Sequence, residues 1–217
     1  MHGKRLLGIY HRLLDRYGRQ HWWPAETPFE VMVGAVLTQN TAWSNVEKAI
    51  ANLKAAGMLE RDSMLSMPRQ ALAEAIHPAG YFNVKAKRLH SLCRFLQRHP
   101  GLERLDSEPL RSRLLSVHGI GPETADDILL YAFNRPVFVV DAYTRRLFSR
   151  VGIIDPDIGY EQLRQGFEKA LGADVPLFNE YHALIVVHGK SVCRPRALCE
   201  ACVLDRHCLQ SGVIRRQ

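Results

Sequence analysis

Apolar residues recur at helical spacing along most of this chain, and that periodicity restricts the fold more than any other feature. Gly18 ends a first helix whose apolar face carries Leu6, Leu7, Tyr10, Leu13, Leu14 and Tyr17. The segment PFEVMVGAVLT, residues 28–38, is apolar on nearly every side, which predicts a helix buried in the middle of a bundle. Ser44 and Glu47 have the spacing of a capping box that opens the next helix, and Gly57 follows its end.

Helical patterns also dominate the rest of the chain, where β-strand signals are nearly absent. Further helices are indicated near residues 68–77, 84–99, 107–117, 122–133, 142–151, 160–171 and 177–188. The one strand-like run, residues 136–140, has no partner run or hairpin turn near it, so an extended connector is expected there. With 217 residues, of which 47% are apolar, the chain is long enough to bury a core. The predicted fold class is all-α, with domain boundaries that composition does not mark.

The charge balance indicates the class of partner. Lysine and arginine number 29 against 22 aspartates and glutamates, and the sequence pI is near 9.3, as expected for a protein that binds nucleic acid. A basic protein without such a partner is the alternative. No apolar run is long enough to span a membrane, and charges interrupt the first residues, so neither a signal peptide nor a membrane partner is expected. In the reducing cytoplasmic setting that this implies, clustered cysteines more often bind metals than form disulfides.

A pair of glycines separates two helical runs in LLSVHGIGPETADDILLYA, residues 114–132. Pro122 suits the first position of the second helix, where its missing N–H costs nothing. Gly119, Ile120 and Gly121 form the turn, and the N–H groups and dipole at the start of the following helix favour an anion. Such a turn can hold a DNA phosphate without reading sequence. Taken alone, Gly-Ile-Gly is also compatible with an ordinary turn.

The wider pattern, L-x-x-V-x-G-I-G-x-x-T-A-x-x-I-L, resembles the helix-hairpin-helix of the endonuclease III superfamily of DNA glycosylases. In that family an extended segment after the second helix ends in an aspartate, which the resemblance places at Asp141. Asp141 taken alone would be a helix N-cap. Its position beyond the hairpin favours a catalytic carboxylate, which can stabilise positive charge at C1′ of the sugar and help to orient water.

Four cysteines near the C-terminus, Cys193, Cys199, Cys202 and Cys208, are a strong metal signal. Structural zinc is one reading, although zinc sites usually use two C-x2-C pairs, and here only the middle two cysteines are so spaced. The run resembles the [4Fe–4S] loop of endonuclease III and the adenine mismatch glycosylases, with a first interval one residue shorter than usual. The resemblance implies a [4Fe–4S] cluster held by these four residues. Cys93, on an apolar helix face, is predicted to be a core thiol.

Glu123 stands where the family's strand-cutting members have a lysine that attacks C1′ and forms a Schiff base. A carboxylate cannot form one. The resemblance therefore implies a monofunctional enzyme that uses water as the nucleophile and leaves an abasic site. Lys85 and Lys87 are interpreted as surface or backbone-contacting residues, and a displaced lyase lysine stays an alternative.

Three segments and Glu123 together resemble the 3-methyladenine DNA glycosylase branch; the segments are HWWP (21–24), GAVLTQNTAW (34–43) and PAGYFNVKAKR (78–88). The likeness implies an aromatic slot for an extruded base, formed by Trp22, Trp23 and Trp43. Indole faces favour the cationic, electron-poor ring of an N3- or N7-alkylated purine. Core anchors are the alternative for these tryptophans.

The same likeness assigns Gln39 and Asn40 to the gap that a flipped base leaves in the DNA stack. A polar helix terminus without that role is the alternative.

The resemblance as a whole implies a two-lobed fold. A six-helix barrel with the hairpin would span residues 25–133, and residues 1–24 and 134–217 would form the second helical lobe, including the four-cysteine loop 193–208. The implied protein is a monomeric, monofunctional DNA glycosylase of base excision repair. It would hydrolyse the N-glycosidic bond of alkylated purines such as 3-methyladenine, flipped from double-stranded DNA; in a prokaryote it would be associated with the nucleoid.

Two other functions stay open. One is a glycosylase for mismatched or oxidised bases, with or without lyase activity. The other is a non-catalytic DNA-binding module, against which Asp141 argues.

Overall fold

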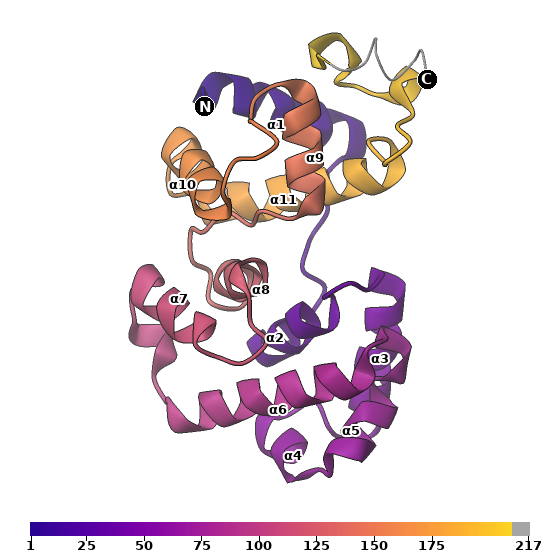
Figure 1. Cartoon of the computed structure of the whole chain (residues 1–217), viewed down its shortest axis with the longest axis vertical. Coiled ribbons are helices and arrows are strands. Elements are labelled where there is room, and N and C mark those ends of the chain that lie inside the picture. Colours follow the sequence, from indigo (N-terminus) through magenta and orange to yellow (C-terminus); the bar gives the residue numbers. More distant parts are fainter. Residues whose placement is uncertain (210–217) are drawn as a thin grey trace. The chain divides into compact units, whose positions relative to one another are not determined.

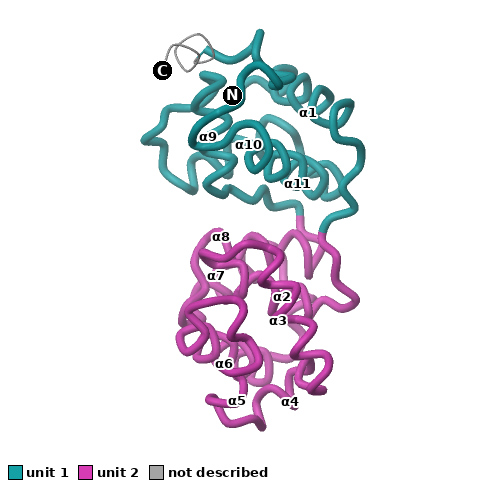
Figure 2. The backbone as a smooth tube through the Cα atoms, turned by 90° about the vertical axis from the view of Figure 1, so that its right-hand side faces the viewer, with its two compact units in different colours: residues 1–22, 136–217 teal, residues 23–135 magenta. Residues whose placement is uncertain are grey.

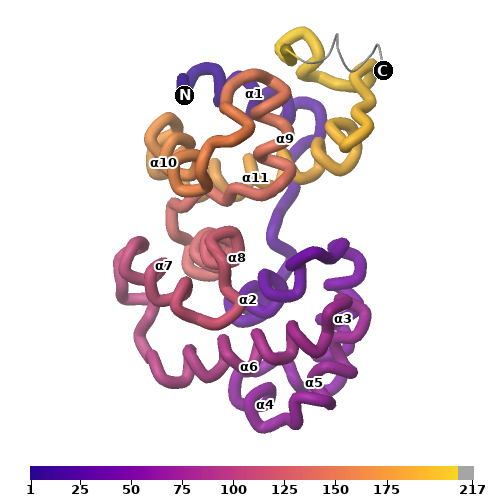
Figure 3. Tube along the Cα trace, in the orientation of Figure 1, coloured from indigo at the N-terminus to yellow at the C-terminus, as the bar shows by residue number. Residues whose placement is uncertain are grey.

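The computed structural model describes residues 1–209, and within them it contains helices and no β-strand (Figures 1 and 3). The all-α prediction is confirmed. The α-helices are α1 Gly3–Tyr17, α2 Pro28–Leu37, α3 Trp43–Ala55, α4 Arg61–Ser66, α5 Arg69–Ala75, α6 Phe82–Arg98, α7 Ser107–Leu115, α8 Pro122–Asp127, α9 Ala142–Val151, α10 Tyr160–Leu171 and α11 Val175–Ser191. Short 3-10 helices lie at η1 His77–Ala79, η2 Leu102–Arg104, η4 Cys199–Ala201 and η5 Asp205–His207, and η3 Ile128–Ala132 is a π-helical turn that continues α8. None of the helices described is long and apolar enough to cross a membrane.

The chain divides into two compact units (Figure 2). Unit 1 comprises residues 1–22 and 136–217, and unit 2 comprises residues 23–135. Because the chain leaves unit 1 and later returns to it, the N-terminal helix α1 packs against the late helices α10 and α11.

The centre of unit 2 is α2, in which every residue from Glu30 to Leu37 is buried. The helix packs against η3, α6, α3 and α8, which explains why its sequence is apolar on nearly all sides. Thr27 caps its start by accepting a hydrogen bond from the backbone N–H of Glu30 (3.1 Å), and Pro28 occupies the first turn. The long helix α6 carries α4 and α5 on another side of the unit (Figure 1).

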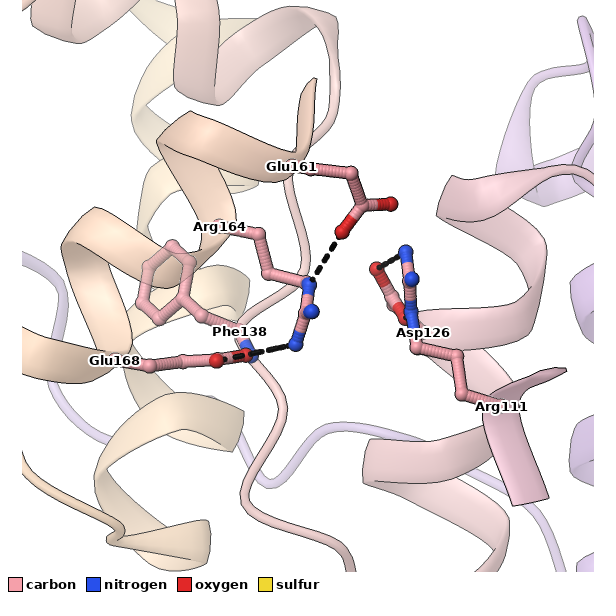
Figure 4. A network of polar contacts seen from close by, with 6 residues as sticks. All are labelled: Arg111, Asp126, Phe138, Glu161, Arg164 and Glu168. Carbon is pink, nitrogen blue, oxygen red and sulfur yellow. Dashed lines mark hydrogen bonds and ion pairs between the residues drawn. The ribbon is translucent and has the colours of Figure 1, made fainter. Parts of the chain in front are cut away.

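The core of unit 1 is aromatic. Phe138 stacks on Phe167 with ring centroids 4.3 Å apart, and Tyr181 is fully buried beside them, donating a hydrogen bond to the Leu6 carbonyl (2.7 Å). The segment 136–140 is extended and unpaired with any strand among the described residues, as expected of a connector. Its backbone is held from α10, because Glu168 accepts from the Phe138 N–H (3.0 Å) while pairing with Arg164 (Figure 4).

The predicted capping box of α3 is wrong. The helix begins at Trp43, and the backbone N–H groups of Asn45 and Val46 both bond to the carbonyl of Ala42, which is the N-cap. Ser44 therefore lies inside the first turn, where its side chain makes no cap hydrogen bond. The spacing of Ser44 and Glu47 has the right form, but the preceding turn starts the helix two residues earlier. The short helix α4 was not among the expected helices.

Candidate functional site

The glycine turn of unit 2 joins α7 to α8 as the sequence indicates. Gly119 has a φ of 88°, and a Cβ there would collide with the side chain of Arg88, so only glycine fits. Ile120 is buried and anchors the turn. Gly121 is the N-cap of α8, followed by Pro122 at its first turn. Within the described residues, no heavy atom outside Gly121 and its chain neighbours lies within 4 Å of the position that a Cβ at Gly121 would take, so the backbone is open to close approach at this glycine.

A buried ion pair ties the two hairpin helices together. Arg111 on α7 donates from Nε and Nη2 to the two carboxylate oxygens of Asp126 on α8, at 2.6 and 3.2 Å (Figure 4). The Asp126 side chain has no exposed surface and that of Arg111 is 6% exposed. Two parallel hydrogen bonds, both shielded from water, restrict the orientation of one side chain relative to the other. The pair therefore fixes how α7 packs against α8.

Gln39, predicted to enter the DNA stack, lies beside the hairpin turn. Its Nε2 donates to the Gly119 carbonyl (3.0 Å) and to the Thr124 hydroxyl (2.9 Å), while its Oε1 accepts from Arg88. Both amide N–H groups are thus used within unit 2. Asn40 is exposed and has a left-handed backbone, with a φ of 53°. The structure therefore places the two residues on one turn next to Gly119, with the Gln39 side chain hydrogen-bonded and Asn40 exposed.

Lys85 and Lys87 were expected to be surface or backbone-contacting residues; Lys87 is exposed, whereas Lys85 is buried and contacts carbonyls of its own chain. The Nζ of Lys85 donates to the carbonyls of Leu37 and Ala79 (2.8 Å each) and to the Thr41 hydroxyl (2.6 Å). Burial, with a smaller contribution from the charge of Arg88, lowers the pKa of Lys85 to about 8. The lysine satisfies carbonyls at the end of α2 and in η1 that have no helical partner.

Tyr81 was not singled out by sequence reasoning. It is 70% exposed, has a φ of 46°, and immediately precedes α6. A large aromatic side chain held in the left-handed region at the surface is unusual. The one sequence signal was an aromatic residue directly after Gly80, where a helix begins.

Trp23 and Trp43 come together in unit 2. Their rings are perpendicular with centroids 5.2 Å apart, and Trp23 also lies 5.2 Å from the ring of Tyr131. A Cβ at Gly34 would lie 3.0 Å from the indole of Trp23, so the glycine makes room for that ring. Trp22 is the last residue of the first segment of unit 1.

The two indoles line a pocket of about 220 Å³ in unit 2. Its other lining residues come from α2, α3 and the segment before α2; they are Pro24, Glu30, Gly34, Glu47, Ile50, Ala51 and Lys54. Lys54 is neutralised by two carboxylates, since its Nζ lies 2.8 Å from Glu26 and 3.0 Å from Glu30. The pocket thus combines aromatic faces with a surplus of negative charge.

Asp141 in unit 1 is the N-cap of α9 and is 8% exposed. Its Oδ1 accepts from the Thr144 N–H at 2.7 Å, and its Oδ2 lies 3.6 Å from Nε2 of His182 on α11. Burial by itself raises the pKa of this carboxyl, but the nearby imidazole of His182 and the hydrogen bond from Thr144 outweigh it, so the pKa is lowered. Asp141 is therefore ionised at neutral pH. Sequence reasoning missed His182, because one histidine in an apolar helix carries no distinctive spacing.

Glu123 lies in the first turn of α8 and is exposed. A carboxylate there is favoured by the positive end of the helix dipole. Its neighbour Thr124 is buried and accepts from Gln39, so this turn connects directly to the loop after α2.

All four cysteines of the loop 193–208 line one pocket in unit 1, together with Leu147, Arg150, Val151, Val192, Ala197, Leu204 and Asp205. Within residues 1–209, no group of three or more His, Cys, Asp or Glu side chains is arranged as a site for a metal ion. Burial, reinforced by the charges of the other three cysteines, raises the pKa of Cys202 to about 11. The thiols are not converged on one point, but four cysteines around one pocket are the set of donors with which an iron–sulfur centre is bound as thiolates.

Two arginines of α9 hold this loop. Arg146 donates to the carbonyls of Cys193 (2.7 Å) and Gly189 (3.0 Å), and Arg150 donates to those of Arg194 (2.6 Å) and Pro195 (2.9 Å). The loop is therefore shaped by the helix that Asp141 caps.

Cys93, in contrast, is fully buried in unit 2, 3.6 Å from the sulfur of Met64. Burial raises the pKa of its thiol to about 12. Its prediction as a core thiol is confirmed.

Comparisons with known proteins agree with this geometry. Residues 33–172 match the model of the HhH-GPD superfamily base excision DNA repair proteins. The chain is 50% identical over 207 residues to the protein named "Putative DNA repair glycosylase MJ1434" of Methanocaldococcus jannaschii, covering 93% of this chain and 94% of that one. It is 30% identical over 198 residues to endonuclease III of Thermotoga maritima, covering 90% and 88% of the two chains.

Solved structures show the same fold. A non-covalent endonuclease III–DNA complex has a TM-score of 0.85 at 19% identity and covers 100% of both chains. The 3-methyladenine DNA glycosylase of H. pylori, bound to 1,N6-ethenoadenine, has a TM-score of 0.75 at 33% identity, covering 88% of this chain and 98% of that one. The chain therefore belongs to the HhH-GPD superfamily of base excision DNA repair proteins, and it is a DNA glycosylase.

Proposed function

We propose that the protein is a monofunctional DNA glycosylase that removes alkylated purines, such as 3-methyladenine, from duplex DNA and leaves an abasic site. The main support for this class of substrate is the pocket of unit 2, which is lined by the rings of Trp23 and Trp43 and by the carboxylates of Glu30 and Glu47. Alkylation at N3 or N7 makes a purine cationic, and both indole faces and carboxylates attract a cation. The similarity to the H. pylori 3-methyladenine DNA glycosylase supports the same class.

DNA binding is assigned to unit 2. The Gly119-Ile120-Gly121 turn would hold a phosphate, and the neighbouring turn with Gln39 and Asn40 would fill the gap left by the extruded base. Tyr81 joins this group as an exposed ring that can stack on a base. Trp22, the third indole of the slot predicted from the sequence, lies in unit 1, and its place in the slot stays a prediction.

Asp141 is assigned the catalytic role. Loss of a purine places positive charge on the sugar, and an ionised carboxylate held by Thr144 and His182 needs no reorganisation to stabilise that charge. The same carboxylate can orient the attacking water. An alkylated purine is already a good leaving group, so little acid catalysis is required.

Absence of lyase activity follows in this proposal from Glu123, because a carboxylate cannot form a Schiff base. Lys85, the alternative amine, is buried and its Nζ donates to three oxygen atoms of unit 2. An amine held in this way is poorly placed to attack a sugar.

The four cysteines, Cys193, Cys199, Cys202 and Cys208, would hold a [4Fe–4S] cluster. Such a cluster supplies a rigid covalent centre for the loop and a site for one-electron chemistry. The protein's own contribution is to hold the start of the loop, which Arg146 and Arg150 do through the carbonyls of Cys193, Arg194 and Pro195.

Base release tests the proposal. Duplex DNA methylated to contain 3-methyladenine and 7-methylguanine is incubated with the enzyme, and free bases are identified by mass spectrometry, alongside duplexes with oxidised, deaminated or mismatched bases. Free 3-methyladenine is expected. If excess enzyme leaves 3-methyladenine in the DNA and releases an oxidised or mismatched base, the substrate class proposed is wrong.

The Trp43→Ala variant should release 3-methyladenine about 10- to 100-fold more slowly in single-turnover assays, because stacking on an aromatic ring contributes roughly 1–3 kcal/mol per base. Trp43→Phe keeps an aromatic face and should retain most of the rate. Equal rates for the alanine variant and the wild type, with both folded by circular dichroism, would remove Trp43 from the slot.

Borohydride should trap no covalent complex between the enzyme and DNA, because no Schiff base forms. The measurement is a denaturing gel of labelled duplex, with a lysine-dependent glycosylase/lyase as positive control. A trapped band would show that an amine acts as the nucleophile. A second trapping with Lys85→Ala would then test whether Lys85 supplies it.

A further inference from the structure

A buried histidine, hydrogen-bonded to a half-buried tyrosine, lies beside one sulfur of the cysteine pocket. His188 on α11 has no exposed surface, its Nδ1 lies 2.9 Å from the hydroxyl of Tyr17 on α1, and its Nε2 lies 3.6 Å from Sγ of Cys202. Tyr17 lies on α1, His188 on α11 and Cys202 in the loop 193–208, all within unit 1. Neither Tyr17 nor His188 has a role in base removal as proposed above.

The chemistry of a ligating sulfur determines the direction of these hydrogen bonds. A cysteine bound to iron is a thiolate without a proton, so only an N–H can face it favourably. A neutral imidazole carries one N–H, and if that group is on Nε2, Nδ1 must accept. Tyr17 then donates its O–H to Nδ1 and selects the tautomer of His188 in which Nε2–H points at Cys202.

We propose that Tyr17 and His188 form a hydrogen-bond relay that raises the reduction potential of the cluster through the sulfur of Cys202; this inference rests on the proposed [4Fe–4S] site. A hydrogen bond to a ligating sulfur withdraws electron density and so favours the reduced state of the iron centre. Arg150, whose Nη1 lies 3.5 Å from Sγ of Cys193, acts in the same sense on a second sulfur. His188 and Tyr17 are positioning residues, because neither touches the substrate.

The test uses full-length protein purified without oxygen, with iron and sulfide content measured first. His188→Leu removes the N–H at similar volume, His188→Gln keeps a side-chain N–H, and Tyr17→Phe removes only the hydroxyl. Tyr10→Phe is the matched control, because Tyr10 lies on the same helix and contacts the rings of His11 and Tyr181. Protein-film voltammetry gives the midpoint potential, and resonance Raman gives the iron–sulfur stretching frequencies.

The potential of His188→Leu should shift to a lower value and its iron–cysteine stretches to a higher frequency. His188→Gln should restore part of the wild-type potential and stretching frequencies. Tyr17→Phe should shift both quantities in the same direction as His188→Leu, but by less. Tyr10→Phe should match the wild type in both. An unshifted potential in His188→Leu with full cluster content overturns the proposal. If that variant loses the cluster, an unshifted Tyr17→Phe overturns it instead.

Metal content separates this inference from the proposed activity. Protein that contains zinc, or no iron, overturns the relay together with the proposed cluster. Release of 3-methyladenine by the same preparation is measured independently of the potential, so the glycosylase proposal stands or falls on its own assay.

Discussion

The Asp141→Asn variant should bind damaged DNA but release its base about 10²- to 10³-fold more slowly, the cost of removing one preorganised electrostatic group from a reacting centre. Asparagine keeps an oxygen that can accept from the Thr144 N–H, so α9 keeps its cap while the negative charge is lost. Single-turnover release of 3-methyladenine and a binding titration on the same duplex measure the two effects separately.

Asp174→Asn is the matched control for this experiment. Asp174 caps α11 in unit 1 with an equivalent hydrogen bond, from the Leu177 N–H at 2.9 Å, but is exposed. It should leave base release unchanged. Full activity in Asp141→Asn would assign the catalytic carboxylate elsewhere.

The pH dependence of the wild type provides a second check on Asp141. Its pKa in the folded protein is lowered below the ordinary value, so the ionised form is favoured by folding. Ionised Asp141 therefore adds to the free energy of unfolding at any pH above the pKa of this group in the unfolded chain. That contribution is lost as the pH falls through the lower pKa of the folded protein. Base release that depends on ionised Asp141 should therefore show no loss attributable to this group between pH 5 and neutrality, a range taken from the usual pKa of aspartate, about 4.

The Asp126→Ala variant should lower the free energy of unfolding by about 3–5 kcal/mol, measured by urea denaturation followed by circular dichroism. It removes one partner of a buried bidentate pair and leaves the charge of Arg111 in a site that is only 6% exposed. The desolvation cost of that charge remains, while its bidentate carboxylate partner is lost. DNA binding should also weaken, because the pair ties α7 to α8 at the hairpin.

Two controls separate burial from charge. Asp62→Ala breaks the exposed pair between Arg61 and Asp62 and should leave the urea midpoint unchanged. Arg111→Met combined with Asp126→Leu replaces both charges by apolar groups and should recover much of the stability. A midpoint for Asp126→Ala equal to the wild type would show that the pair adds nothing to the fold.

Much of the helical structure could be predicted from residue patterns. The predicted ranges 142–151 and 160–171 coincide with α9 and α10, because local periodicity, an aspartate cap and glycines set those ends. The capping box at Ser44 and Glu47 failed for a reason that is also local: the turn before it starts the helix at Trp43. The short helix α4 carries too few turns for periodicity to show it.

Contacts between distant segments could not be predicted in this way. The burial of Lys85 depends on carbonyls at Leu37 and Ala79, which the sequence separates and the packing of α6 brings together. The hydrogen bonds of Gln39 with Arg88 and with the Gly119 carbonyl likewise join three segments that lie far apart in the chain.

Residue patterns alone predicted a helical chain, a glycine turn that opens a helix at Pro122 and the residue types that can carry chemistry, because periodicity, φ and charge are properties of short segments. Tertiary structure alone decided that Asp141 pairs with His182, that Trp23 and Trp43 share a pocket with carboxylates, and that His188 faces Cys202. These pairings set local pKa values and hydrogen-bond directions, and they arise only when packing brings side chains from distant segments together and shields them from water.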